Sequence, residues 1–250
     1  MKIKRVICCL FLIVFSFMGG VAITFHPSFQ EALLPPFFPK VSQVIYRKAY
    51  ALAYDGKIKG ASFVYEELKP SSGDTAGASF KFKEDPLIPK SLRSTLLDFK
   101  GSRFDRGHLC SAASALTLEA KKETFYLSNI SPQVPDLNRK LWLKLERYAR
   151  SLIPLWDKIY VITGPLFMPR TDEKGARYIR YEVIGPQDVA VPSHYFKVLY
   201  KVKDQEVFTE AFLMPNHALS QSQEALDLNL YHTSLEMIEK MAGITLKKNL

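Results

Sequence analysis

Cysteine is scarce in this sequence. Two of its three cysteines, Cys8 and Cys9, are adjacent in an apolar N-terminal segment, so only Cys110 belongs to the rest of the chain. A disulfide within that part is excluded, and so is a zinc site that needs several thiolates at short spacing. We expect Cys110 to be a small buried residue; the alternative, a nucleophile, lacks any nearby feature that stabilises a thiolate.

Repetition is absent as well. The chain has no internal repeat, no heptad run and no change of composition after about residue 42. Of its 250 residues, 47% are hydrophobic and 12% aromatic, enough to bury a substantial core and to exclude disorder as the default state. The simplest interpretation is one domain over residues 42–250.

The N-terminus differs from that domain. The basic start MKIKR precedes about 20 apolar residues with small residues at 20–22, a pattern typical of an export signal. Residues 1–25 are therefore predicted to be a signal peptide or, because residues 6–25 are long enough to span a bilayer, a retained membrane anchor. The proline-containing segment 26–41 is predicted to be a linker. Both alternatives place the domain outside the cytoplasm: periplasmic, secreted, or anchored at the membrane.

Short β-rich runs punctuated by glycine, proline and aspartate predict the strands of one sizeable sheet. They are 50–55, 61–68, 159–167, 180–185, 194–202 and 207–215.

Two segments predict helices. Residues 138–153 carry an apolar stripe at helical spacing, made of Leu141, Leu145, Tyr148 and Leu152. Residues 233–243 begin with a capping box from Thr233 to Glu236 and end at Gly243. Because strands and helices do not alternate regularly, the fold class is predicted to be α+β.

The charge balance indicates an anionic partner. The formal net charge is +9 and the basic residues are spread along the whole chain. Nucleic acid, an acidic lipid surface, or both would suit such a protein.

The stretch SRFDRGHLCSAAS places Arg106, Gly107 and His108 together. His108 alone could equally satisfy a core hydrogen bond or lie on the surface. Gly107 carries no side chain, so backbone or phosphate can approach closely between its two neighbours.

More polar residues follow at Asn129, Gln133, Asn138, Glu146 and Arg150. Simple structural roles are available for some: Asn138 as a helix cap, and Glu146 with Arg150 as a solvated i,i+4 pair. Together, however, the set suits phosphodiester cleavage. Imidazole can take a proton from water, arginine matches phosphate geometry, and amide and carboxylate oxygens suit Mg²⁺.

The segments GSRFDRGHLCSAA, TFYLSNISPQVPDLNRKLWLKLERYARSL, YVITGPLFMPRT and VAVPSHYFKVL closely resemble the DNA/RNA non-specific endonuclease family, in particular its endonuclease G branch. The likeness extends from about Tyr46 to the C-terminal helix. It implies a ββα-metal core in a mainly antiparallel central sheet flanked by helices. It also implies hydrolysis of DNA, RNA or both to 5′-phosphate products, a Mg²⁺ cofactor that Mn²⁺ can replace, and commonly a homodimer.

The resemblance further implies residue roles. His108 matches the general base, Asn138 the direct metal ligand, and Glu146 the carboxylate that holds metal-bound water. Arg106 and Arg150 match contacts to phosphate and leaving group. The polar residues that shape the substrate site are matched by Asn129 and Gln133.

One position departs from the family pattern. Some members carry a further arginine shortly before an Asp-Pro, and the matching place here is near Phe80. We expect Lys83 to supply that charge, although a lysine cannot reproduce a guanidinium fork. Two other functions stay open: a catalytically silent nucleic-acid-binding module, against which the complete residue set argues, and a membrane-tethered protein that contacts lipid, against which the dispersed charge argues.

Overall fold

We describe the protein from a computed structural model, in which residues 43–70, 73, 75–219 and 226–246 are described. The leader or anchor predicted for residues 1–25 and the linker predicted for 26–41 lie outside these residues. None of the helices among the described residues has the length and apolar character needed to cross a bilayer.

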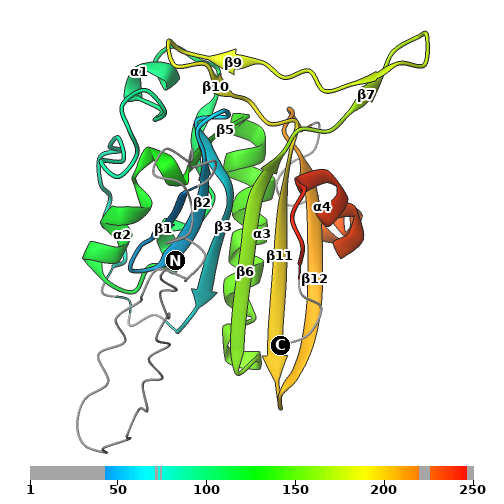
Figure 1. Ribbon diagram of the computed structural model, residues 1–250. Helices are drawn as coiled ribbons and strands as arrows, with labels where there is room; N and C mark the ends of the chain where they lie inside the picture. Colours follow the sequence, from blue (N-terminus) through cyan, green and yellow to red (C-terminus); the bar gives the residue numbers. More distant parts are fainter. Residues whose placement is uncertain (1–42, 71–72, 74, 220–225, 247–250) are drawn as a thin grey trace, which may run out of the picture. The chain divides into compact units, whose positions relative to one another are not determined.

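A six-stranded sheet forms the centre of the fold, and every neighbouring pair of its strands is antiparallel (Figure 1). Five of the six predicted runs are strands of this sheet. The sixth, 180–185, is wrong as a sheet strand: only Val183–Ile184 (β9) is extended, and it pairs with Val189–Ala190 (β10). In spatial order the sheet contains β1 (Gln43–Tyr46), β2 (Tyr50–Asp55), β3 (Gly60–Leu68), β6 (Lys158–Leu166), β11 (His194–Lys203) and β12 (Glu206–Pro215).

Helices cover both faces of the sheet. On one face lies α3 (Leu143–Ser151), whose Leu145 is completely buried; on the other lies α4 (Leu235–Ala242) with the buried Ile238 (Figure 1). Alternation along β11 explains how one strand serves both layers, because successive side chains point to opposite faces. Tyr195 packs in the core beside α3, and Phe196 packs in the core beside α4.

The helix ends differ in detail from the prediction. The cap of α4 is Ser234 in place of Thr233, because its Oγ accepts a hydrogen bond from the backbone N–H of Met237. The helix ends as predicted at Gly243, where φ is +65°. The predicted helix 138–153 begins as a π-helical turn and becomes α-helical only at Leu143.

The remaining elements are short. They are α1 (Leu96–Phe99), β4 (Asp105–His108), η2 (Ala112–Ser114), α2 (Leu118–Thr124), η3 (Leu127–Asn129), β5 (Ile130–Gln133), η4 (Leu137–Trp142), η5 (Ile153–Leu155), β7 (Arg170–Thr171), β8 (Arg177–Tyr178) and η6 (Leu228–Tyr231). Most of them connect the long strands, but β4, β5 and η4 carry the residues discussed next.

Candidate active site

Two short strands and a helix bring the predicted residues together. β4 pairs antiparallel with β5, so that His108 lies opposite Ile130 and Gly107 lies opposite Ser131. The π-helical turn η4 follows β5 closely and continues into α3. Trp142 at the end of η4 donates its indole N–H to the backbone oxygen of His108 at 3.2 Å. The helix that carries Asn138 and Glu146 is thereby fixed against the strand that carries His108.

Gly107 is required by a side chain of the neighbouring strand. A Cβ at this position would lie 2.1 Å from Oε1 of Gln133, far inside van der Waals contact. The close approach predicted here is therefore real, but Gln133 makes it, where the sequence had suggested backbone or phosphate. Gln133 is fully buried, and neither amide atom has a hydrogen-bond partner among the described residues.

The imidazole of His108 lies in an aromatic setting. Its centroid is 4.9 Å from that of Phe125, edge-on, and 5.5 Å from that of Phe82. Its Nε2 is buried without a hydrogen-bond partner in the described part of the chain. Burial disfavours the imidazolium and lowers the pKa of His108 to about 4. His108 is therefore neutral at pH 7, the state in which it can accept a proton.

Asn129 braces the chain just beyond that histidine. Its Oδ1 accepts from the backbone N–H of Cys110 at 2.9 Å, and its Nδ2 donates to the carbonyls of Cys110 and Thr124 at 3.0 and 2.9 Å. Its exposed fraction is 0%. These contacts make Asn129 a residue that shapes the site from inside, and with no exposed surface it does not contact substrate directly.

Asn138 is held by a carboxylate. Its Nδ2 donates to Oδ2 of Asp105 at 2.9 Å, and Arg139 binds the same carboxylate with Nε and Nη2 at 2.8 and 2.7 Å. Partial burial opposes ionisation of Asp105, but the hydrogen bonds from Arg139 and Asn138 outweigh it and hold the pKa of Asp105 below its ordinary value. The capping alternative for Asn138 is wrong, because the residue that precedes η4 as its N-cap is Asp136.

This arrangement suits a hydrated divalent cation. With Nδ2 of Asn138 committed to Asp105, its amide oxygen is the atom left to act as an acceptor. No group of three or more His, Cys, Asp or Glu side chains that could hold a metal occurs among the described residues. An ion at Asn138 would take most of its ligands from water, as Mg²⁺ does when few protein oxygens are present.

Glu146 and Arg150 meet through a third residue. Ser111 donates to Oε2 of Glu146 at 2.9 Å and accepts from Nη1 of Arg150 at 3.2 Å, while Arg150 and Glu146 are 3.9 Å apart. The two side chains are only 12% and 24% exposed, so the alternative of a solvated pair is wrong. Burial raises the pKa of Glu146, opposed by Lys197 and by the hydrogen bond from Ser111. Nothing in the sequence pattern identified Ser111.

The predicted cations have different surroundings. Arg106 is exposed and its guanidinium lies 4.6 Å from the ring centroid of Phe82, beside His108. Lys83 is tied by its backbone N–H to the carbonyl of Phe125. Phe80 and Phe82 both pack on Phe125, and alternation along an extended segment puts Lys83 on the opposite face. The geometry therefore does not support Lys83 as the residue that supplies the charge of the family's further arginine.

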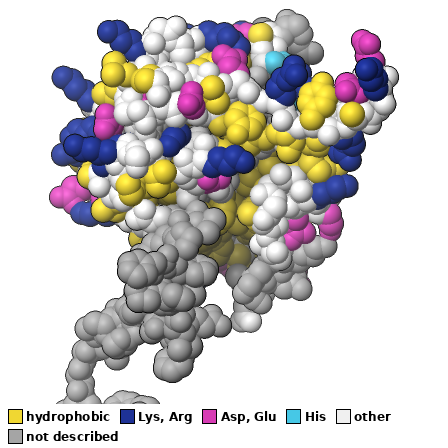
Figure 2. All heavy atoms as spheres, turned by 45° about the horizontal axis from the view of Figure 1, so that its top comes forward, with side chains coloured by type: hydrophobic (Ala, Val, Ile, Leu, Met, Phe, Trp, Pro, Cys, Tyr) yellow, Lys and Arg dark blue, Asp and Glu magenta, His cyan; other side chains and the backbone are white. Residues whose placement is uncertain are grey.

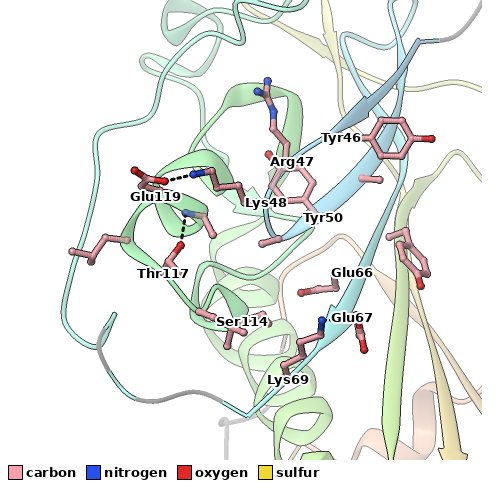
Figure 3. Close-up of a pocket in the computed structure, with 16 residues that line it drawn as sticks. Tyr46, Arg47, Lys48, Tyr50, Glu66, Glu67, Lys69, Ser114, Thr117 and Glu119 are labelled. Carbon is pink, nitrogen blue, oxygen red and sulfur yellow. Dashed lines mark hydrogen bonds and ion pairs between the residues drawn. The ribbon is translucent and has the colours of Figure 1, made fainter. Parts of the chain in front are cut away.

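A large open cavity near β3 lies apart from these residues. It has a volume of about 940 Å³ and is bounded by β2, β3 and the start of α2 (Figure 3). Its lining includes Tyr46, Lys48, Glu66 and Lys69, but none of the predicted site residues. Pocket size alone would thus have directed attention away from His108.

Comparison with known proteins decides the family. The model of the DNA/RNA non-specific endonuclease family matches residues 32–250. The chain belongs to this family. It is 41% identical over 216 residues to "Endonuclease G, mitochondrial" of Bos taurus, covering 85% of this chain and 71% of the relative. It is 39% identical over 206 residues to "Nuclease C1" of Cunninghamella echinulata, covering 80% of each.

A solved structure of an EndoG/EndoGI complex, which concerns EndoG inhibition, has the same fold. It superposes with a TM-score of 0.75 at 33% identity and covers 84% of this chain and 87% of that one. The resemblance predicted from the motifs is therefore confirmed, as is the α+β fold with a mainly antiparallel central sheet.

Proposed function

We propose that this member of the DNA/RNA non-specific endonuclease family hydrolyses phosphodiester bonds of DNA, RNA or both, with Mg²⁺ as cofactor and little preference for sequence. The observation that carries the proposal is a neutral, half-buried His108 on β4, with its Nε2 enclosed, fixed against the helix that bears Asn138, Glu146 and Arg150. The relatives support it by their names, endonuclease G and mitochondrial nuclease.

The residues divide the chemistry among them. His108 takes a proton from the attacking water, which its neutral state at pH 7 allows. Arg106 and Arg150 bind and neutralise the phosphate oxygens. Asn138 would hold the metal ion through its amide oxygen, and Glu146 would hold it through water. When bound, Mg²⁺ or a substituting Mn²⁺ supplies positive charge at the leaving oxygen. Asn129 and Gln133 keep these groups in place.

The surface supports binding through phosphates. Figure 2 shows Lys and Arg side chains dispersed over the visible face, with acidic and apolar side chains among them. With a formal charge of +9, such a distribution favours contact with many phosphates along a backbone. Phosphates carry no direct sequence information, so cleavage should be broad.

Location and assembly are further parts of the proposal. We retain residues 1–25 as a leader or anchor, 26–41 as a linker and 42–250 as the nuclease domain, exported from the cytoplasm, with a homodimer as the assembly. Several relatives are called mitochondrial, and that location is theirs. Sequencing the N-terminus of the protein recovered from cells, with fractionation, would test the leader, and sedimentation would test the dimer.

Activity is tested by incubating the purified protein with plasmid DNA and with RNA, each with Mg²⁺ and with EDTA. We expect EDTA-sensitive cutting at many positions. His108→Ala is the matched control: it should fold and bind DNA, but cut roughly 10²–10⁴-fold more slowly, as expected for loss of a general base. Binding without EDTA-sensitive cutting by the wild type would instead identify a silent nucleic-acid-binding module.

A further inference from the structure

A buried lysine lies behind the site. Lys197 on β11 is 2% exposed, and its Nζ donates to Oγ1 of Thr163 at 2.6 Å. The same ammonium lies 4.9 Å from the ring centroid of Trp142, the residue that binds the backbone of His108. A fully buried ammonium is costly unless charges of opposite sign compensate it. The compensating groups are two buried carboxylates, described next.

The carboxylates come from opposite sides. Glu66 on β3 is 3% exposed, and Glu146 on α3 carries a side chain that is 12% exposed. Burial lowers the pKa of Lys197, whereas the charges of Glu66 and Glu146 raise it. With Arg150, the cluster contains two carboxylates and two cations, so its formal charges cancel.

A small, partly open cavity lies among these groups. Its volume is about 10 Å³, close to what one water molecule requires. Both carboxylates, both cations and two serine hydroxyls line it, which offers a water more than the two to four polar partners it needs. The lining polar residues are Glu66, Ser111, Ser114, Glu146, Arg150 and Lys197.

The cluster is also tied to the chain beyond His108. The thiol of Cys110 donates to Oε2 of Glu66 at 3.3 Å, and the backbone of Cys110 is the segment braced by Asn129. Figure 3 shows Glu66 on β3 beside the 940 Å³ pocket, so this carboxylate forms the wall between that pocket and the buried cluster. Its side chain is too enclosed for solvent to screen its charge.

We propose that Lys197 is a positioning residue of the nuclease site, whose ammonium, acting through one water in this cavity that Glu66 shares, holds the carboxylate of Glu146 where it meets the hydrated metal ion. The proposal rests on the function proposed above. Without Lys197, Arg150 is the one cation left among the residues that line this cavity, and the repulsion between the two carboxylates displaces Glu146. The loss should appear in metal binding, because outer residues that orient a metal's ligands typically change its affinity 10- to 100-fold.

The same strand provides a matched control. Lys201 lies four residues further along β11, on the same face, and is 9% exposed. It too lies over a tryptophan, 5.0 Å from the centroid of Trp156, and pairs with Glu210 at 3.1 Å. Lys201→Met therefore removes a comparable ammonium from a comparable setting without touching the cluster around Glu146.

The experiment compares Lys197→Met, Lys201→Met and the double variant Glu66→Gln/Lys197→Met with the wild type. Mn²⁺ affinity is measured on the protein alone by electron paramagnetic resonance, DNA binding is measured in EDTA, and melting temperature is recorded throughout. Lys197→Met should weaken Mn²⁺ binding about tenfold or more and leave DNA binding within about twofold. Lys201→Met should bind Mn²⁺ as the wild type does. The double variant should regain part of the affinity, because one repelling carboxylate is gone.

Unchanged Mn²⁺ affinity in folded Lys197→Met would overturn the proposal, as would an equal loss in Lys201→Met. If Lys197→Met does not fold, Mn²⁺ affinity is compared between the double variant and Glu66→Gln. Equal Mn²⁺ affinities of these two variants would overturn the proposal. A wild type that binds Mn²⁺ but cuts no nucleic acid refutes the proposed function instead, so the two failures are distinguishable.

Discussion

Phe82→Ala is expected to change the pH dependence of cleavage, because Phe82 covers the imidazole of His108. Burial is the cause of the low pKa of His108, about 4 against an ordinary 6.5. That difference corresponds to roughly 3 kcal/mol against the protonated form. The rings of Phe82 and Phe125 both lie against the imidazole. Removing Phe82 and admitting water should recover about half of this free energy and bring the pKa of His108 near 5.

The sign follows from the role of the base. Only neutral His108 accepts a proton, so kcat/KM falls as pH drops through the pKa of the free enzyme. Between pH 7 and pH 5 the neutral fraction of a base with a pKa near 4 falls by only about a tenth. The neutral fraction of a base with a pKa near 6.5 falls about 25-fold over the same range. We expect the wild type to follow the first case and Phe82→Ala to lose about two- to threefold.

The assay is kcat/KM on plasmid DNA from pH 4.5 to 8 at saturating Mg²⁺. Phe82→Ala also removes the ring beneath Arg106, so its overall rate should fall, and the position of the acidic limb is the quantity to compare. Phe208→Ala is the control, because Phe208 is 46% exposed and packs on Trp156 instead. If kcat/KM of the wild type falls about 25-fold between pH 7 and pH 5, the low pKa of His108 is refuted. If the acidic limb of the pH profile is at the same pH in Phe82→Ala as in the wild type, burial by this ring is not the cause of the low pKa.

Three further predictions concern other parts of the site. Gly107→Ala should lower the free energy of unfolding by roughly 1–3 kcal/mol, because its Cβ would collide with Gln133. Gly60→Ala is the control, because a Cβ there would meet nothing within 4 Å. Equal melting temperatures of the two variants would contradict this prediction. Asn138→Ala should lower the free energy of unfolding by only about 1 kcal/mol, through loss of its hydrogen bond to Asp105, but should abolish most Mn²⁺ affinity and activity. Full activity of this variant would show that Asn138 is not part of the site. DNA affinity should fall steeply between low and physiological salt with little dependence on sequence, and cleavage ends confined to one short sequence would show that base contacts govern binding.

The sequence by itself determined the five longest strands, the two longest α-helices and the family. Short β-rich runs bounded by glycine, proline and aspartate located β2, β3, β6, β11 and β12, and the apolar stripe located α3, because local composition and helical spacing are written directly along the chain. The tetrapeptide at 105–108 and the segment after Asn129 carried the likeness to the endonuclease family, which the family comparison confirmed.

Tertiary structure alone decided which side chains meet. Gln133 lies over Gly107, Ser111 joins Glu146 to Arg150, and Asp105 holds Asn138. The partners in these contacts are 26 to 39 residues apart in sequence, so no local pattern pairs them. The same holds for Lys197, which reads in sequence as an ordinary strand lysine. Its burial follows from the packing of α3 onto β11, because only that contact decides which face of the strand is closed to water.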